Sequence, residues 1–252
     1  MSNYKHRAGF FFCLLFSLFC SLALTGAFGI LPAFAESDEI VLGEETNRAA
    51  VSDPYERFNR AVFNANDKLY FWALRPAATA YAAVVPLEFR TSVNNAAKNF
   101  ESPARVANCI LQRKGCRAST EMKRFLINST LGLGGMYDFA QSEFGISSPQ
   151  EEDFGLTLAH YGVGAGAFVM LPLLGPSDAR DLLGYGVDHT VMDPMFWIPT
   201  AVWVDPAVKA GKILNTTSLR LGKYEEFKKS AVDPYVSMRE AYMQHRENEI
   251  RQ

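Results

Sequence analysis

The chain has 252 residues and a formal net charge of −2. A nearly neutral chain offers no electrostatic attraction for nucleic acid, so that class of partner is excluded. The length is sufficient for one domain with a substantial core.

The N-terminus has the pattern of a targeting segment. Lys5 and Arg7 precede an uncharged run over residues 8–35, which ends in Ala-Phe-Ala. This pattern predicts a secretory signal over residues 1–35, cleaved after Ala35. The apolar run is also long enough to span a bilayer, so an uncleaved anchor is the alternative. Cleavage removes two cations and no acid, which changes the formal charge from −2 to −4.

The remaining chain begins with a polar stretch. Residues 36–52 are polar and acidic and predict a flexible tether ahead of a single domain over residues 53–252. Asp53-Pro54-Tyr55-Glu56 has the pattern of a capping box, with the aspartate as N-cap. We therefore expect the first helix of the domain to begin here.

This first helix is apolar on more than one face. Phe63, Tyr70 and Phe71 interrupt the side opposite its main apolar stripe. A second apolar face requires a second apolar neighbour, either protein or lipid. The Arg75-Pro76 step is expected to end or kink the helix.

Three further helices are predicted in the middle of the chain. The first covers residues 86–100, the second begins at Ser102-Pro103, and the third begins with Ser119 as its cap. Glycines at positions 132, 134 and 135 are expected to end the third helix.

Two cysteines follow the signal segment. Cys109 and Cys116 lie on either side of Gly115, which is expected to open a turn. In an oxidising compartment they could form a disulfide, and two buried free thiols are the alternative. The four histidines are scattered along the chain, so we predict no metal site.

Residues 154–177 form the most informative stretch, because they contain no Asp, Glu, Lys or Arg but five glycines and Pro172. The length and polarity suit a membrane interior, yet the glycines and the proline exclude a regular spanning helix. Irregular backbone at membrane depth requires surrounding protein or a water-filled cavity. The stretch therefore predicts either a passage within a bilayer or a buried loop–helix junction in a soluble core.

The C-terminal third adds an aromatic stretch and a charged helix. Phe196, Trp197 and Trp203 lie in an uncharged segment typical of a membrane-interface belt. The last helix, from Asp233 to about Arg251, is heavily charged and is expected to be a solvated amphipathic element outside any bilayer. Strand signals are weak, because Pro172 and the glycines interrupt the short apolar run over residues 167–171. The predicted class is all-α.

The sequence contains no recognisable catalytic constellation. Gly162-x-Gly164-x-x-Ala167 matches a loose dinucleotide pattern but follows no strand of a βαβ unit. His160 and Asp153 could act as a base and its orienting partner, yet no nucleophile lies in a recognisable elbow. We therefore expect no enzymatic activity and no cofactor.

Six motifs occur in order along most of the chain. They are Asp53–Arg60, Arg75-Pro76, Asn128–Asp138, Asp153–Gly164, Gly175–Asp181 and Asp233–Tyr242. Together they resemble the VacJ/MlaA family of outer-membrane proteins. The resemblance implies a single helical, ring-like domain whose amphipathic helices lie in one membrane leaflet around a central channel.

The resemblance also implies a function in lipid transport without catalysis. Proteins of this family remove phospholipid that has strayed into the outer leaflet of the outer membrane and pass it to a periplasmic carrier. The expected partners are phospholipid, a trimeric outer-membrane porin and a periplasmic lipid-carrier protein, and the expected location is the periplasmic face of the outer membrane. The alternatives are a soluble periplasmic module that binds a hydrophobic ligand, and a phospholipid hydrolase with His160 as its base.

Matching motifs place candidate residues at the channel and its gate. They are Phe58, Asn59, Phe63, Asn64, His160, Tyr161, Gly162, Gly164, Gly166 and Arg180. Asn59, Asn64, His160 and Arg180 are the candidates for contact with a lipid headgroup. The chain departs from many family members because neither Cys13 nor Cys20 lies in a lipoprotein cleavage box. We expect the aromatic belt and porin contact to retain it at the membrane.

Overall fold

The computed structural model describes residues 53–194 and 204–252. The signal segment, the tether and the aromatic belt of Phe196, Trp197 and Trp203 lie outside these described residues. The described chain is predominantly helical, as the sequence predicts. Its elements are α2 (Glu56–Leu69), the π-helical turn η2 (Tyr70–Leu74), α3 (Arg75–Val84), α4 (Leu87–Leu111), α5 (Gly115–Thr130), α6 (Phe139–Ser142), α7 (Phe154–His160), β1 (Phe168–Leu171), β2 (Gly175–Asp178), α8 (Ala179–Val187), η3 (Asp188–Met192), α10 (Val204–Leu219), α11 (Lys223–Ser230) and α12 (Pro234–Arg251).

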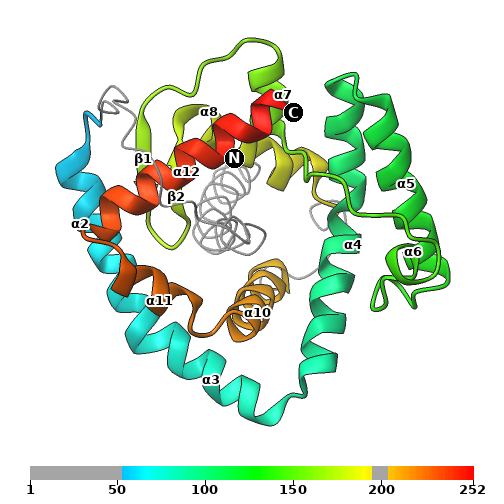
Figure 1. The fold of residues 1–252 in the computed structure, drawn as a ribbon, viewed down its shortest axis with the longest axis horizontal. Helices are drawn as coiled ribbons and strands as arrows, with labels where there is room; N and C mark the ends of the chain where they lie inside the picture. Colours follow the sequence, from blue (N-terminus) through cyan, green and yellow to red (C-terminus); the bar gives the residue numbers. More distant parts are fainter. Residues whose placement is uncertain (1–52, 195–203) are drawn as a thin grey trace, which may run out of the picture.

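The helices form a ring (Figure 1). Helices α2, α3 and α4 follow one another around its edge, and α12 with α7 and α8 closes the remaining side. Helix α10 lies inside this ring and packs against α3 and α4, while α5 packs along α4 on the outer side. Each helix within residues 53–194 and 204–252 is too short or too polar to cross a bilayer.

The first helix neither begins nor ends as predicted. Asp53 does not form a capping box, because Glu56 pairs with Arg60 at 2.7 Å on the next turn and Tyr55 occupies the N-cap. The chain also continues as helix through Pro76. Proline lacks the N–H that an α-helical bond requires, and the π-helical turn η2 lies directly before it, where the Arg75 N–H donates to the Tyr70 carbonyl.

Helix α4 is continuous where the sequence predicts two helices. Pro103 lies inside it. Around the proline, the Arg105 guanidinium donates to the Lys98 carbonyl at 3.0 Å and to the Ser102 hydroxyl at 2.7 Å. These side-chain bonds hold the turn together, so Ser102 does not begin a new helix.

The start of α5 differs from the prediction, and its end agrees with it. It begins at Gly115 rather than at Ser119, whose hydroxyl instead donates to the Cys116 carbonyl at 2.8 Å within the helix. Its glycine stop is confirmed, because Gly134 and Gly135 have positive φ directly after the last turn. The two cysteines carry free thiols, Cys109 buried and Cys116 exposed, so the disulfide considered from the sequence is not formed.

A short β-hairpin forms in a stretch whose strand signals are weak. Strands β1 and β2 pair antiparallel, with Phe168 opposite Asp178 and Met170 opposite Pro176. The missing N–H of Pro176 is tolerated because a two-stranded hairpin leaves each strand a free edge. Asp178 caps α8 by accepting the Asp181 N–H at 2.7 Å.

A small apolar core joins three segments that are distant in sequence. It consists of Val62, Phe63, Phe168, Met170, Tyr235 and Tyr242 from α2, β1 and α12. The Phe63 and Tyr235 rings meet edge to face at 5.9 Å. Helix α12 begins at the predicted Asp233 cap, which accepts two backbone N–H groups. One face of α12 is buried and the opposite side is exposed, as expected for an amphipathic helix.

Candidate functional site

Many large apolar side chains on the helices of the ring are exposed. We call the exposed set on α2 to α4 the apolar belt. It comprises Tyr55, Phe58, Leu69, Trp72, Val84, Leu87, Phe89, Phe100, Ile110 and Leu111. Trp72 is 78% exposed and Val84 is 83% exposed. A surface this apolar is unusual for a soluble monomer and indicates contact with a membrane or with another protein.

The buried face of α12 shows the opposite chemistry. Tyr235, Arg239, Tyr242 and Arg246 recur at helical spacing and are all buried. They pair with carboxylates from three other segments, and we call this set the polar lock. Its carboxylates are Asp53 before α2, Asp153 before α7 and Asp181 in α8.

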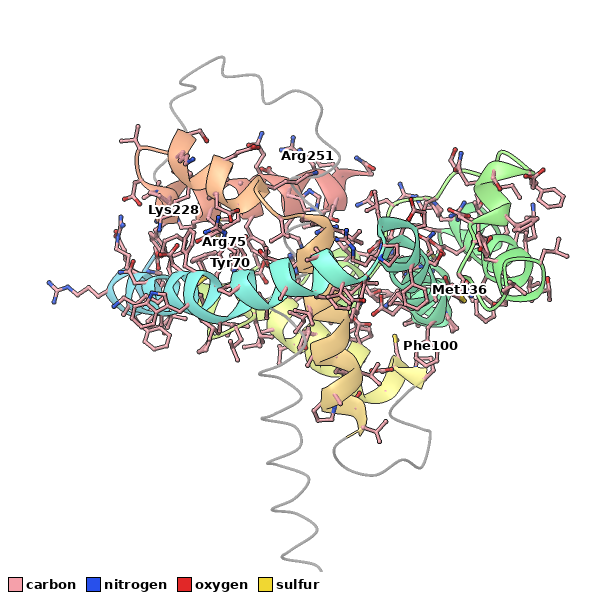
Figure 2. The ribbon with its side chains drawn as sticks, turned by 90° about the horizontal axis from the view of Figure 1, so that it is seen from below. Tyr70, Arg75, Phe100, Met136, Lys228 and Arg251 are labelled. Atoms are coloured by element: carbon pink, nitrogen blue, oxygen red, sulfur yellow. The ribbon has the colours of Figure 1, made fainter. Side chains whose placement is uncertain are left out.

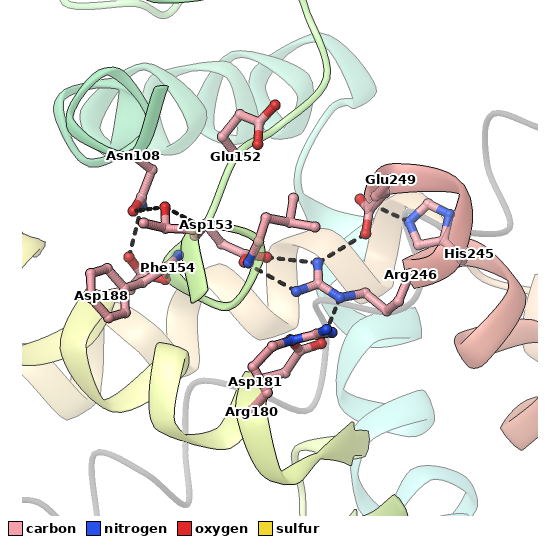
Figure 3. Close-up of polar contacts among 12 residues, drawn as sticks. Asn108, Glu152, Asp153, Phe154, Arg180, Asp181, Asp188, His245, Arg246 and Glu249 are labelled. Carbon is pink, nitrogen blue, oxygen red and sulfur yellow. Dashed lines mark hydrogen bonds and ion pairs between the residues drawn. The ribbon is translucent and has the colours of Figure 1, made fainter. Parts of the chain in front are cut away.

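Arg246 is the centre of the polar lock (Figure 3). Its guanidinium holds Asp153 by two hydrogen bonds of 2.8 and 3.1 Å, and its Nε lies 2.5 Å from Asp181. Glu249 on the next turn of α12 accepts a further bond at 2.9 Å. Bidentate arginine–carboxylate bonds fix orientation as well as distance. One side chain therefore fixes the starts of α7 and α8 against α12.

The tyrosines of α12 complete the polar lock. The Tyr242 hydroxyl donates to Asp181 at 2.5 Å, and the Tyr235 hydroxyl donates to Asp53. Burial alone would raise the pKa of the Asp181 carboxyl, but Arg246 and Tyr242 hold that pKa below its ordinary value. Asp181 is therefore a charged partner at neutral pH.

A second buried polar network joins α4, α7 and η3 (Figure 3). Asp188 accepts the Asn108 amide at 3.0 Å and the Phe154 N–H at 2.9 Å. The Thr157 hydroxyl donates to Asn108 at 3.0 Å and accepts from Gln112 at 3.1 Å. Burial raises the pKa of Asp188 to about 7, so this carboxyl titrates near neutrality.

Three of the residues predicted for the channel are occupied by contacts within the protein. Asn59 is fully buried and binds β1, accepting the Met170 N–H at 2.8 Å and donating to the Phe168 carbonyl. Arg180 is buried and pairs with Asp178 and Asp181, and Phe63 belongs to the apolar core. In this geometry they position backbone and helices.

The other predicted residues are exposed. Phe58 and Asn64 lie on the exposed face of α2. His160 and Tyr161 are exposed at the end of α7, where their rings meet edge to face at 5.3 Å and the tyrosine hydroxyl donates to the Leu111 carbonyl. The predicted set is therefore divided between the buried interior and two separate exposed places.

The glycines of the uncharged stretch have two different roles. Gly162, Gly164 and Gly166 lie in the exposed connection between α7 and β1, and two of them have positive φ (85° at Gly162 and 74° at Gly166). Gly155 and Gly184 instead mark a close crossing of α7 and α8, where a Cβ on Gly184 would lie 2.3 Å from the Gly155 nitrogen. Sequence reasoning missed this crossing.

Sequence reasoning also missed the polar lock. The signal was present, because Tyr235, Arg239, Tyr242 and Arg246 repeat every three to four residues along α12. Charged side chains on a helix usually indicate a solvent-exposed face. The carboxylates that pair with this face of α12 come from distant segments of the sequence. Within the described ranges, the His, Cys, Asp and Glu side chains form no group that could hold a metal ion.

Comparison with known proteins places this ring among relatives with similar sequence and shape. Residues 51–249 match a family model described as "MlaA lipoprotein". An uncharacterised protein of Rickettsia felis is 35% identical over 200 residues, which is 79% of this chain and 78% of the relative. The Escherichia coli "Intermembrane phospholipid transport system lipoprotein MlaA" is 33% identical over 208 residues, covering 79% of this chain and 78% of the relative.

A solved structure has the same fold. It is described as "Structural basis for maintenance of bacterial outer membrane lipid asymmetry", and it aligns with a TM-score of 0.69 and 32% sequence identity. The alignment covers 80% of this chain and 100% of that chain.

Proposed function

The chain belongs to the MlaA lipoprotein family, and we propose on this premise that it is a non-enzymatic component of a phospholipid transport system. It removes phospholipid that has strayed into the outer leaflet of the outer membrane and passes it to a periplasmic carrier. The observation that carries this proposal is the apolar belt of exposed side chains on the helices of the ring.

The physical argument for a membrane location rests on the exposed apolar side chains of the apolar belt. In water, each exposed apolar side chain loses roughly 1.5–3 kcal/mol relative to burial. A ring that lies in one leaflet returns the apolar belt to an apolar medium, and it needs no spanning helix to do so. We therefore place the chain at the periplasmic face of the outer membrane, with the belt among acyl chains.

We propose that lipid enters through the exposed connection between α7 and β1. Gly162 and Gly164 have open space around them, since an added Cβ on either would meet nothing within 4 Å. Tyr161 and His160 lie at the start of this connection, and a glycine-rich backbone is suited to hinge motion. With Phe58 and Asn64, they are our candidates for contact with lipid. The expected protein partners are a trimeric porin and a periplasmic lipid carrier.

The test is the amount of phospholipid on the cell surface of a strain that lacks this gene. We expect phospholipid to accumulate in the outer leaflet of this strain and to fall when the intact chain is restored. An unchanged surface would contradict the proposal. Fractionation separates the alternative function, because a soluble periplasmic binding module is released without detergent whereas a leaflet-embedded ring is not.

A further inference from the structure

The junction of η2 and α11 forms a cationic cavity that the transport route above does not use. The cavity measures about 530 Å³ and is lined by Phe71, Arg75, Glu225, Lys228 and Lys229. Three of these side chains are cations and one is a carboxylate. The lining therefore attracts an anion.

An aromatic ring holds two of the cations in place. The Lys228 ammonium lies 4.9 Å and the Arg75 guanidinium 5.9 Å from the centre of the Phe71 ring. Tyr70 packs edge to face against Phe71 at 5.2 Å and against Tyr224 at 4.7 Å, which fixes the ring. Cation–π contact of this kind orients positive charge before a ligand arrives.

The charges within the cavity are not fully balanced. Arg75 pairs with Glu225 at 2.8 Å, and Lys228 pairs with Asp67 at 2.8 Å. Among the described residues, no carboxylate pairs with Lys229, which is exposed at the edge of the same cavity. One positive charge therefore remains for a ligand, and two further cations lie beside it.

The spacing along the helix helps to produce this arrangement. Phe71 and Arg75 are four residues apart and therefore lie on the same side of the helix. Figure 2 shows Tyr70, Arg75 and Lys228 together, where the rod of α2, η2 and α3 meets α11. On the same rod, Leu69 and Trp72 are exposed members of the apolar belt.

We propose that this cavity binds the phosphate of an anionic membrane phospholipid headgroup. The proposal rests on the function proposed above, because it requires the apolar belt to lie among acyl chains. The adjoining cations then lie at headgroup depth, where Trp72 suits the same interface. Guanidinium and ammonium groups are the side chains that bind phosphate in proteins. The cavity thus fixes the depth at which the ring lies.

The test measures binding of the full chain, purified in mild detergent, to vesicles of phosphatidylcholine with and without phosphatidylglycerol. Lys229→Gln should weaken binding to the anionic vesicles about fivefold, and Lys229→Glu about twenty-five-fold, because each cation near such a surface contributes about that factor. The matched variants Lys123→Gln and Lys123→Glu change an exposed lysine of α5 that forms no ion pair with the described part of the chain, and they should change binding less than twofold. Equal losses at both lysines would overturn the proposal.

A further variant separates a built site from diffuse attraction. Phe71→Leu keeps every charge but removes the ring beneath Lys228 and Arg75, so anionic binding should fall about two- to fivefold. No change would overturn the proposal. Inorganic phosphate should displace the anionic vesicles more strongly than chloride at equal ionic strength, because it competes for the same cations, and equal displacement by the two anions would also overturn the proposal. The proposal would also be overturned if these variants weakened binding to an acidic protein but left binding to the anionic vesicles unchanged.

Binding to phosphatidylcholine alone tests the premise separately. The apolar belt should bring the wild-type chain and the lysine variants to neutral vesicles equally. If the wild-type chain does not bind neutral vesicles, the proposed membrane location fails. If all variants bind both vesicles as the wild type does, only the phosphate site fails.

Discussion

The apolar belt and the polar lock reverse the usual arrangement of a soluble protein. The belt exposes Trp72 and Val84, whereas the lock buries Arg246 and Arg239 together with Asp53, one of the carboxylates that pair with them. The two regions use side chains of opposite chemistry for different purposes. The lock determines how the segments are held together, and the belt determines which medium surrounds them.

This difference predicts that the two regions respond differently to substitution. A buried charge depends on its partner, so loss of the partner leaves an uncompensated charge away from water. An exposed apolar side chain makes few contacts within the protein, so its loss hardly affects folding. Stability should therefore depend on the lock, and membrane binding on the belt.

The largest effect is expected for Arg246→Ala. The change leaves Asp153, Asp181 and Glu249 without their shared cation, and removal of one partner from a buried pair lowers the free energy of unfolding by about 3–5 kcal/mol. Urea unfolding in detergent measures it. Arg251→Ala is the control, because its pair with Glu247 is exposed and contributes about 0–1 kcal/mol. Equal losses of unfolding free energy in Arg246→Ala and Arg251→Ala would show that the polar lock stabilises the fold no more than an exposed ion pair does.

The free energy of unfolding should depend on pH through two neighbouring residues, Asp188 of the second buried polar network and His189, whose contributions change with pH in opposite directions. Burial raises the pKa of Asp188 to about 7, so its stabilising contribution is present at low pH and is lost as pH rises through 7. Burial lowers the pKa of His189 to about 4, so its contribution is present above its ordinary value and is lost as pH falls through 4. Between about pH 4.5 and 6 the two slopes oppose each other.

Substitution of Asp188 or His189 should reveal how the other residue changes the free energy of unfolding with pH. Relative to the wild type, the free energy of unfolding of Asp188→Asn should rise with pH in this window, because only the His189 contribution remains. The corresponding value for His189→Gln should fall with pH, because only Asp188 remains. Each slope should approach about 1.4 kcal/mol per pH unit. Slopes of the same sign in both variants would contradict the assignment.

A smaller effect is expected at the contact between α2 and the hairpin. Asn59→Ala leaves the buried Met170 N–H without an acceptor and should lower the free energy of unfolding by about 1–3 kcal/mol. Asn64→Ala, on the exposed face of the same helix, should change it by less than about 0.5 kcal/mol. If both variants unfold at the same urea concentration, Asn59 has no structural role of the kind described.

These two asparagines show how far the sequence predicts the molecule. Asn59 and Asn64 are alike in type and lie in one helix, so the sequence predicted lipid contact for both. What separates them is the hairpin that packs on one side of α2, and its strand signal is weak because Pro172 and the glycines interrupt it. Local signals, such as the Asp233 cap and the glycine stop after α5, were confirmed because they depend only on neighbouring residues.

Tertiary partners explain the other differences. Pro103 does not break α4, because Arg105 bonds across the turn before it. The charged face of α12 is buried, because carboxylates from three distant segments meet it. A pattern in one helix indicates its periodicity but not which medium or partner each face contacts.

Substitution in the apolar belt should weaken membrane binding without lowering the free energy of unfolding. Trp72→Gln should change the free energy of unfolding by less than about 0.5 kcal/mol, because this side chain is 78% exposed. It should weaken vesicle binding by about tenfold, the effect of losing roughly 1.5 kcal/mol of apolar burial. Trp72→Phe, which keeps an aromatic ring, should bind nearly as the wild type does. Destabilisation by Trp72→Gln would show that this part of the belt packs within the protein.

A further prediction concerns the proposed gate, the exposed connection between α7 and β1. Gly164 has open space around it, so Gly164→Ala should be neutral or raise the free energy of unfolding by about 0.4–1 kcal/mol through a less flexible unfolded chain. Gly166→Ala should instead destabilise the fold, because φ there is +74° and an added Cβ would lie 2.9 Å from Ala179. If hinge motion at this connection admits lipid, Gly164→Ala cells should accumulate outer-leaflet phospholipid although the protein is as stable as the wild type. A normal cell surface with a stable Gly164→Ala protein would show that Gly164 is not part of the hinge.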